Sequence, residues 1–358
     1  MTLRPALLLI LALPCFSQPV PAPYPAQTEG DFIARNFVFK SGETLAELPL
    51  HYITLGTPVR NASGRVTNAV LVMHGTGGTG GAFLSAAFGG ELFRAGQPLD
   101  AARYFLILPD AIGHGKSARP GNGLHARFPH YRYDDMVRAN HQLLHEGLHI
   151  DHLRLVMGTS MGAMQTWIWG EMYPDDMDAL LPLASAPVEI AGRNRMFRAM
   201  VMDAIRQDPA WKDGEYTAPP AQGLVAAQYA LWMMTSSPLQ MHKTSPTREK
   251  ADEAVAALRR RALLTDANDM LYQFEAGTDY NPSPLLEQIT APLYAINSAD
   301  DVVNPPELGI LEREIRRVRH GRYILIPTSD ETRGHGTHSR AAVWKQYLVE
   351  LLQETSRS

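Results

Sequence analysis

The stretch Val156–Met164, VMGTSMGAM, decides the fold, because it is typical of a strand that runs into a sharp turn and then into a helix. Ser160 lies at the apex of the turn, with Gly158 two residues before it and Gly162 two residues after it. This GxSxG spacing lets a strained turn project a serine hydroxyl from the top of a sheet without a side-chain collision. An apolar run precedes the motif, and an apolar helical pattern follows it as far as Pro174. The pattern predicts a nucleophilic serine, and the alternative is a glycine-rich turn with a solvated serine.

Residues 1–17 have the pattern of an export signal, with Arg4 followed by the apolar run ALLLILAL and then by small or polar residues. This run is shorter than the about 20 apolar residues that cross a bilayer. We therefore expect a secreted or periplasmic protein without a stable membrane span, cleaved near Ser17. Lipidation of Cys15 is the alternative that stays open. Cleavage would leave a mature chain without cysteine, which excludes disulfides and zinc sites built on thiolates.

The composition is that of a globular chain behind a short linker. Residues 18–30 are rich in proline and predict an extended linker. The hydrophobic content of 45% is ample for a large core. The net charge of −4 is spread over interspersed residues of both signs, without the basic stripe that nucleic acid requires. We therefore expect no nucleic-acid partner.

The first half of the chain alternates predicted strands and helices. Residues 37–55 alternate in polarity and predict an antiparallel hairpin at one edge of a sheet. Buried strands are predicted at Ala69–Met73 and Tyr104–Pro109, and an amphipathic helix at Asp134–His145. This succession of strands and helices implies a parallel sheet with right-handed crossovers.

The glycine-rich turn that follows the strand Ala69–Met73 predicts half of an oxyanion hole. Serine hydrolases of this architecture take one amide from such a turn and the other from the residue after the nucleophile. We assign these two amides to Thr76 and Met161. His74 in the same turn, and His114 in the next glycine-rich turn, are interpreted as structural histidines rather than catalytic bases.

Three segments carry a resemblance to a known family: GTSMGAMQ at 158–165, DDMVRANHQLL at 134–144 and AIRQDPAWKDGEY at 204–216. The chain resembles the homoserine O-acetyltransferase branch of the α/β-hydrolase superfamily from about Phe37 to its C-terminal helix. The resemblance implies an α/β-hydrolase fold, in which helices flank a mostly parallel sheet and a helical lid is inserted over the active site.

The resemblance also implies the domain organisation. We expect the first part of the hydrolase core at residues 31–187, the helical lid at 188–283 and the second part of the core at 284–358. The lid region is rich in Ala, Met, Leu, Arg and Gln, which suits a set of helices. The resembling family pairs through its lid helices, so a homodimer through the lid is a further hypothesis.

The resemblance places a carboxylate and a histidine late in the chain, in the order Ser, Asp, His. Asp301 stands four residues before Pro305, as the family pattern requires, and Asp300 is the alternative acid. His335 matches the family's Gly-His position, and His338 is the alternative base. We therefore expect a catalytic set of Ser160, Asp301 and His335.

This set predicts hydrolysis of a small carboxylic ester through an acyl-enzyme, with no metal and no bound cofactor. The resembling acetyltransferases hold homoserine with a lid arginine and an aspartate beside the catalytic histidine, where this chain has Gln228 and Gly336. Acyl transfer to homoserine is therefore the alternative function, with Arg195, Arg198 and Glu189 as the first candidates for charged partners. A catalytically inactive binding module is the second alternative.

Overall fold

The computed structural model describes residues 24–356, so the predicted export signal lies outside the described residues. Within them, one eight-stranded sheet has the order β1-β2-β4-β3-β5-β6-β7-β8. The pairs β1·β2 and β2·β4 are antiparallel, and every pair from β4 to β8 is parallel. The strands are β1 (Thr28–Val38), β2 (Thr44–Leu55), β3 (Ala69–Met73), β4 (Phe105–Pro109), β5 (Leu155–Thr159), β6 (Leu180–Leu183), β7 (Leu293–Ser298) and β8 (Gly321–Ile326).

Helices bury both faces of the sheet, because the side chains of each strand alternate between the two faces. Leu71 and Val156 pack with α2 and α3, whereas Val70, Val72 and Met157 pack with α1 and α10 on the other face. The inner strands β3, β4, β5, β6 and β7 are therefore buried along their whole length, as the sequence of β3 and β5 predicts. The helices are α1 (Gly89–Leu92), α2 (Tyr133–Gln142), α3 (Met161–Met172), α4 (Gly192–Arg206), α5 (Ala221–Thr235), α6 (Pro238–Thr244), α7 (Arg248–Ala262), α8 (Ala267–Glu275), α9 (Ile310–Glu314) and α10 (Ala341–Glu354).

Two element boundaries differ from the sequence predictions. Strand β1 begins at Thr28, so the last residues of the predicted linker belong to the sheet, where Thr28 lies opposite Thr54 of β2. The helix predicted to end at His145 is α-helical only to Gln142. It continues as a π-helical turn, η4 (Leu143–Gly147), because the N–H of Leu148 bonds to the C=O of Leu143 five residues earlier.

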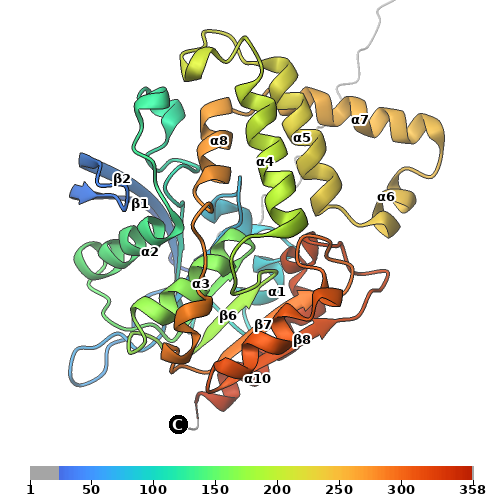
Figure 1. The fold of residues 1–358 in the computed structure, drawn as a ribbon. Helices are drawn as coiled ribbons and strands as arrows, with labels where there is room; N and C mark the ends of the chain where they lie inside the picture. Colours follow the sequence, from blue (N-terminus) through green and yellow to red (C-terminus); the bar gives the residue numbers. More distant parts are fainter. Residues whose placement is uncertain (1–23, 357–358) are drawn as a thin grey trace, which may run out of the picture.

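Helices α4 to α8 all lie between β6 and β7 in the chain, inside the range 188–283 predicted for the lid. Helices α4, α5 and α8 stand over one end of the sheet, and α6 and α7 project on the right (Figure 1). One hydrophobic cluster joins α4, α5 and α8 to Val303 of the core, through Phe197, Leu224 and Phe274. The lid helices thus have a core of their own.

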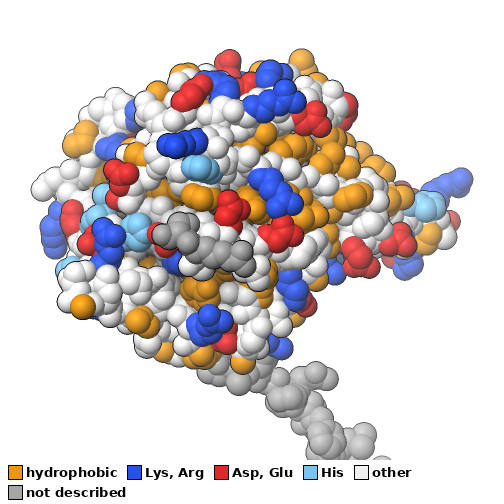
Figure 2. Space-filling model, turned by 90° about the horizontal axis from the view of Figure 1, so that it is seen from below, with side chains coloured by type: hydrophobic (Ala, Val, Ile, Leu, Met, Phe, Trp, Pro, Cys, Tyr) orange, Lys and Arg blue, Asp and Glu red, His pale blue; other side chains and the backbone are white. Residues whose placement is uncertain are grey.

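The face seen from below carries acidic and basic side chains that are interspersed (Figure 2). Among residues 24–356, no helix combines the length and the apolar character needed to cross a membrane. The absence of a nucleic-acid partner stays a prediction.

The lid surface leads to a prediction about assembly. Met196 and Met200 of α4 and Met233 of α5 are exposed, and apolar side chains gathered on neighbouring helices favour association. We expect a homodimer by light scattering at micromolar concentration. Met200→Glu combined with Met233→Glu should shift it to a monomer, because charges would be buried in the interface.

The control for this experiment is Val59→Glu, which changes an equally exposed apolar side chain outside the lid. It should leave the dimer intact. A monomeric wild-type protein, or dissociation by Val59→Glu as readily as by the lid variant, would reject the lid interface.

Candidate active site

Ser160 occupies a strained turn between β5 and α3. Its φ of 51° and ψ of −110° lie in a region that non-glycine residues rarely adopt. The Ser160 N–H donates to the C=O of Leu183 on the neighbouring strand, at 2.8 Å. The turn therefore holds the serine at the carboxyl end of the sheet, as its motif predicts.

Gly158 and Gly162 permit this turn because backbones approach each other where their side chains would be. A Cβ on Gly158 would lie 2.2 Å from the backbone of Gly162. A Cβ on Gly162 would lie 2.0 Å from the carbonyl oxygen of Met73, at the end of β3. Only glycine fits at either position, so the two residues fix how α3 crosses the strands.

The structure brings Ser160, His335 and Asp301 together in a chain of hydrogen bonds. The Ser160 Oγ lies 2.8 Å from His335 Nε2, and His335 Nδ1 lies 2.9 Å from Asp301 Oδ2. The three residues follow β5, β8 and β7, whose carboxyl ends meet at one edge of the parallel sheet. This arrangement allows the imidazole to accept a proton from the serine while the carboxylate holds its other nitrogen.

Asp301 is buried, but its surroundings favour the ionised form. Burial alone would raise the pKa of Asp301, whereas His335 beside it, together with hydrogen bonds from His335, Asn304 and Val303, brings that pKa below its usual value. The Val303 N–H donates to Oδ1 at 2.8 Å, and the Asn304 side chain donates to Oδ2 at 3.1 Å. The sequence analysis missed Asn304, although its place directly before Pro305 in the same turn was a usable signal.

Asp300, the alternative acid, faces the loop that carries His335 rather than its imidazole. Its Oδ2 accepts hydrogen bonds from the Gly334 N–H at 2.9 Å and from the Thr332 hydroxyl at 3.0 Å. Asp300 therefore orders the loop backbone directly before His335. No local pattern indicated this role, because it depends on contacts with residues more than thirty positions away.

His338, the alternative base, makes no hydrogen bond to Ser160. Its ring lies 5.4 Å from that of His335, centroid to centroid, and its Nδ1 is buried without a partner. Burial and the neighbouring His335 lower the pKa of His338 to about 3. His338 is therefore a neutral imidazole beside the hydrogen-bonded set.

His74 and His114 are buried among backbone groups. His74 Nδ1 lies 2.8 Å from the carbonyl oxygen of Gly75, and the Ala111 N–H donates to His74 Nε2 at 3.0 Å. His114 Nδ1 lies 3.0 Å from the carbonyl oxygen of Ile112. These contacts agree with the structural interpretation of both histidines.

Thr76 and Met161 offer backbone N–H groups near Ser160. Thr76 lines the same cavity as Ser160, and Met161 follows Ser160 as the first residue of α3. The first N–H groups of a helix have no acceptor within the helix. In the described part of the chain, neither N–H donates to a loop carbonyl or to a side chain. The assignment of these two N–H groups to an oxyanion hole stays a prediction.

Ser160 opens into a cavity of about 370 Å³ between the core and the lid. A volume of this size suits a small organic molecule. Among the described residues, no aspartate or glutamate lines this cavity. Its apolar lining consists of Ala82, Phe83, Phe88, Met164, Phe197, Leu231, Phe274 and Val303.

Arg198 of α4 lines the same cavity. The sequence analysis named it only as a candidate charged partner for the alternative function, acyl transfer. It is buried, and its Nε donates to Asn194 at 2.9 Å and its Nη1 to Tyr133 at 3.3 Å. Its guanidinium lies 5.6 Å from the Phe274 ring centroid. No carboxylate of the described residues forms an ion pair with it. An anionic ligand group would supply the missing partner.

The other residues considered for charged contacts contribute no charge to this cavity. Gly336 lines the cavity but provides no charge, and Gln228 lies outside it with its amide 3.8 Å from the sulfur of Met270. Glu189 lines a neighbouring cavity of about 350 Å³. Arg195 lines neither cavity.

Comparisons with known proteins agree on the fold. A family model described as the alpha/beta hydrolase fold matches residues 68–314. A probable acyltransferase of Methanothermobacter thermautotrophicus is 28% identical, over 77% of this chain and 84% of that protein. A homoserine O-acetyltransferase of Geotalea uraniireducens is 34% identical over 53% of this chain, and the match spans only 54% of that enzyme. The structure of an acetylester hydrolase from Corynebacterium glutamicum superposes with a TM-score of 0.79 at 22% identity, covering 91% of this chain and 96% of that one.

The glycine contacts lead to a stability prediction. Gly162→Ala should lower the free energy of unfolding by about 3 kcal/mol or more, because its new Cβ would collide with a backbone carbonyl that cannot move away. Gly90→Ala is the matched control, since the nearest atoms to its Cβ would lie at 3.7 Å or beyond. Urea unfolding of the two variants checks this. Equal midpoints for both variants would contradict the close backbone contact.

Proposed function

The chain belongs to the α/β-hydrolase family, which confirms the predicted fold class, and on that premise we propose that it cleaves a carboxylic ester as a serine hydrolase. The observation that carries the proposal is the hydrogen-bonded set of Ser160, His335 and Asp301, of which Ser160 and His335 line a largely apolar cavity. The substrate class is a small ester.

In the proposed reaction, His335 Nε2 takes the proton of Ser160 as the Oγ attacks the ester carbonyl carbon. Asp301 holds the other ring nitrogen and stabilises the imidazolium. The N–H groups of Thr76 and Met161 donate to the oxyanion, each worth about 3 kcal/mol of transition-state stabilisation. The alcohol leaves with the proton from His335, and water then attacks the acyl-enzyme in the same way.

Water is the proposed acyl acceptor because of the charges in the cavity. The ammonium group of an amino acid would find no carboxylate among the described residues that line it, and an unpaired buried charge costs several kcal/mol. Arg198 can pair with a carboxylate, so an ester that carries an acid group is compatible with the site.

Acyl transfer is the second candidate, and Arg198 is the observation that favours it. The relatives include proteins named as an acyltransferase and a homoserine O-acetyltransferase. A cation in the serine cavity would suit the carboxylate of an amino-acid acceptor.

We also propose export, on the pattern of residues 1–17 alone.

Three variants test the proposed roles. Ser160→Ala should reduce cleavage of p-nitrophenyl acetate by roughly 10⁶-fold. Asp301→Asn should reduce kcat by about 10⁴-fold, because the imidazole loses its orienting carboxylate. Asp300→Asn should cost far less, since its carbonyl oxygen can still accept from Gly334. Initial rates over pH 6–9 measure all three.

Retained activity of Ser160→Ala would refute the nucleophile, and equal losses for the two aspartate variants would refute Asp301 as the orienting acid. The wild-type protein should also react with an active-site serine probe. A folded protein that neither cleaves esters nor labels would instead support the inactive binding module.

The acceptor is tested separately. Homoserine added at millimolar concentration should not raise the rate of p-nitrophenyl acetate cleavage, and acetyl-CoA with homoserine should release no free CoA. Arg198→Met should leave cleavage of this neutral ester within about threefold, while lowering kcat/KM for an acetyl ester that carries a carboxylate by at least about tenfold. Homoserine-dependent CoA release by the wild type would establish the transferase instead.

A further inference from the structure

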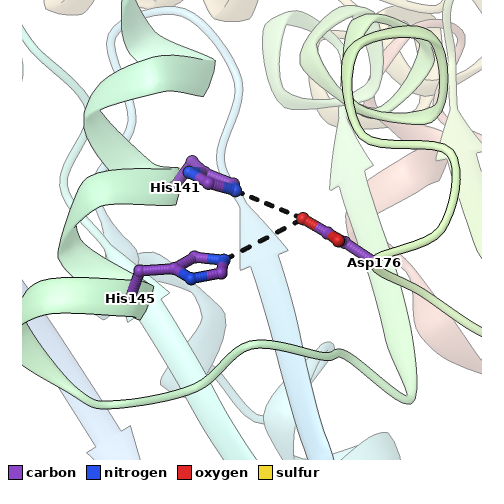
Figure 3. Close-up of side chains that lie close together, drawn as sticks. All are labelled: His141, His145 and Asp176. Atoms are coloured by element: carbon purple, nitrogen blue, oxygen red, sulfur yellow. Dashed lines mark hydrogen bonds and ion pairs between the residues drawn. The ribbon is translucent and has the colours of Figure 1, made fainter.

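Three side chains that the proposed reaction does not use converge near the end of α2 (Figure 3). His141 Nε2 lies 3.2 Å from Asp176 Oδ2, and His145 Nε2 lies 3.9 Å from the same oxygen. One ligand atom from each residue lies within 4.8 Å of the others. The sequence analysis expected no metal site, and no local motif joins the two histidines to Asp176.

The cluster lies at the opposite edge of the sheet from Ser160. Ser160 follows the carboxyl end of β5, whereas Asp176 precedes the amino end of β6. Strands β5 and β6 run parallel, so these two ends belong to opposite edges. A group bound at His141, His145 and Asp176 would therefore not touch the ester.

The spacings from the two histidines to Asp176 are close to those between the ligands of a tetrahedral metal ion. His141 and His145 are four residues apart, across the join between α2 and the π-helical turn η4, and both rings point to Asp176. Ligands about 2.0–2.2 Å from a zinc ion are separated from one another by about 3.3–3.6 Å. The distances of 3.2 Å and 3.9 Å to Asp176 need only small side-chain movements to reach that geometry.

Neighbouring groups already hold two of the ligands in place. The His141 ring stacks between the rings of Tyr173, at 3.8 Å, and His145, at 4.1 Å. The backbone of Asp176 is fixed on both sides, since its N–H donates to Tyr173 at 3.1 Å and its C=O accepts from Leu153 at 2.8 Å. Little conformational entropy is therefore lost on binding.

The chemistry of the ligand set selects a class of metal. Two imidazoles and one carboxylate favour zinc and similar divalent transition metals over magnesium or calcium. All three residues are partly exposed, so water can complete the coordination.

We propose that His141, His145 and Asp176 bind one divalent transition-metal ion, with zinc as the type case, that ties the end of α2 to the loop between α3 and β6. The site is structural, because its edge of the sheet is remote from the reacting groups.

The test uses the full-length protein, stripped with a chelator and titrated with zinc chloride in a calorimeter. We expect one zinc ion per chain and a rise in unfolding temperature of about 3 °C or more, since the ion binds the folded state. Magnesium chloride at the same concentration should have neither effect. Cleavage of the neutral ester should be the same with and without zinc.

Two variants locate the site. His145→Gln and Asp176→Asn should each weaken zinc binding by at least about tenfold, because each removes one of three protein ligands. His152→Gln is the control: His152 pairs with Asp178 at 2.8 Å near the same edge, but among residues 24–356 this pair belongs to no group of three possible ligands. Absence of zinc binding by the wild type, or an affinity unchanged in both ligand variants, would overturn the proposal.

Discussion

The close contact of three backbones, at the ends of β3 and β5 and the start of α3, is the constraint on which the rest of the structure depends. Gly158 and Gly162 make this contact, and any Cβ there would collide with a neighbouring backbone. Because α3 must cross so near the strands, the connecting residue Ser160 is forced to a positive φ, a strain of about 1–3 kcal/mol. The burial of α3 offsets this strain, since side chains such as Trp167 are fully enclosed between the sheet and its neighbours.

The sequence predicted those parts of the fold that local patterns encode. The bounds of β3 agree with the prediction, and β5 and α3 flank Ser160 as the motif required, because an apolar run and a glycine spacing are local features. The succession of strands and helices predicted a parallel sheet, and the family resemblance added the helical lid and indicated which late residues to compare. The structure joins Ser160, His335 and Asp301 by hydrogen bonds, although their catalytic roles stay predictions.

The remaining features depend on contacts between distant parts of the chain, which no local pattern records. Asp300 could be compared with Asp301 only by its distance from Pro305, whereas its contact with the backbone of Gly334 follows from the way β7 and β8 pair. In the sequence, nothing distinguishes Arg198 from the other polar residues of a lid helix. Its position at the serine cavity follows from the packing of α4. His145 lies in the π-helical turn after α2, and its contact with Asp176 depends on how that turn packs against the loop before β6.

The charges of the cavity determine what the serine can act upon. His338 stays neutral, since burial and His335 lower its pKa to about 3, so it adds no positive charge that would compete with the imidazolium formed on His335. Asp301 accepts hydrogen bonds from Val303 and Asn304 and pairs with His335, and it forms no ion pair with Arg198. The guanidinium of Arg198 is therefore left in a largely apolar cavity with a phenyl ring and neutral side chains as its neighbours. An unpaired charge in an apolar cavity costs free energy, and a neutral ester does not reduce that cost. A zwitterionic amino acid would pair its carboxylate with the guanidinium but leave its own ammonium unpaired. An ester bearing one carboxylate would pair with the guanidinium and leave no charge unpaired. Among these three kinds of molecule, we therefore expect the cavity to bind the anionic ester best.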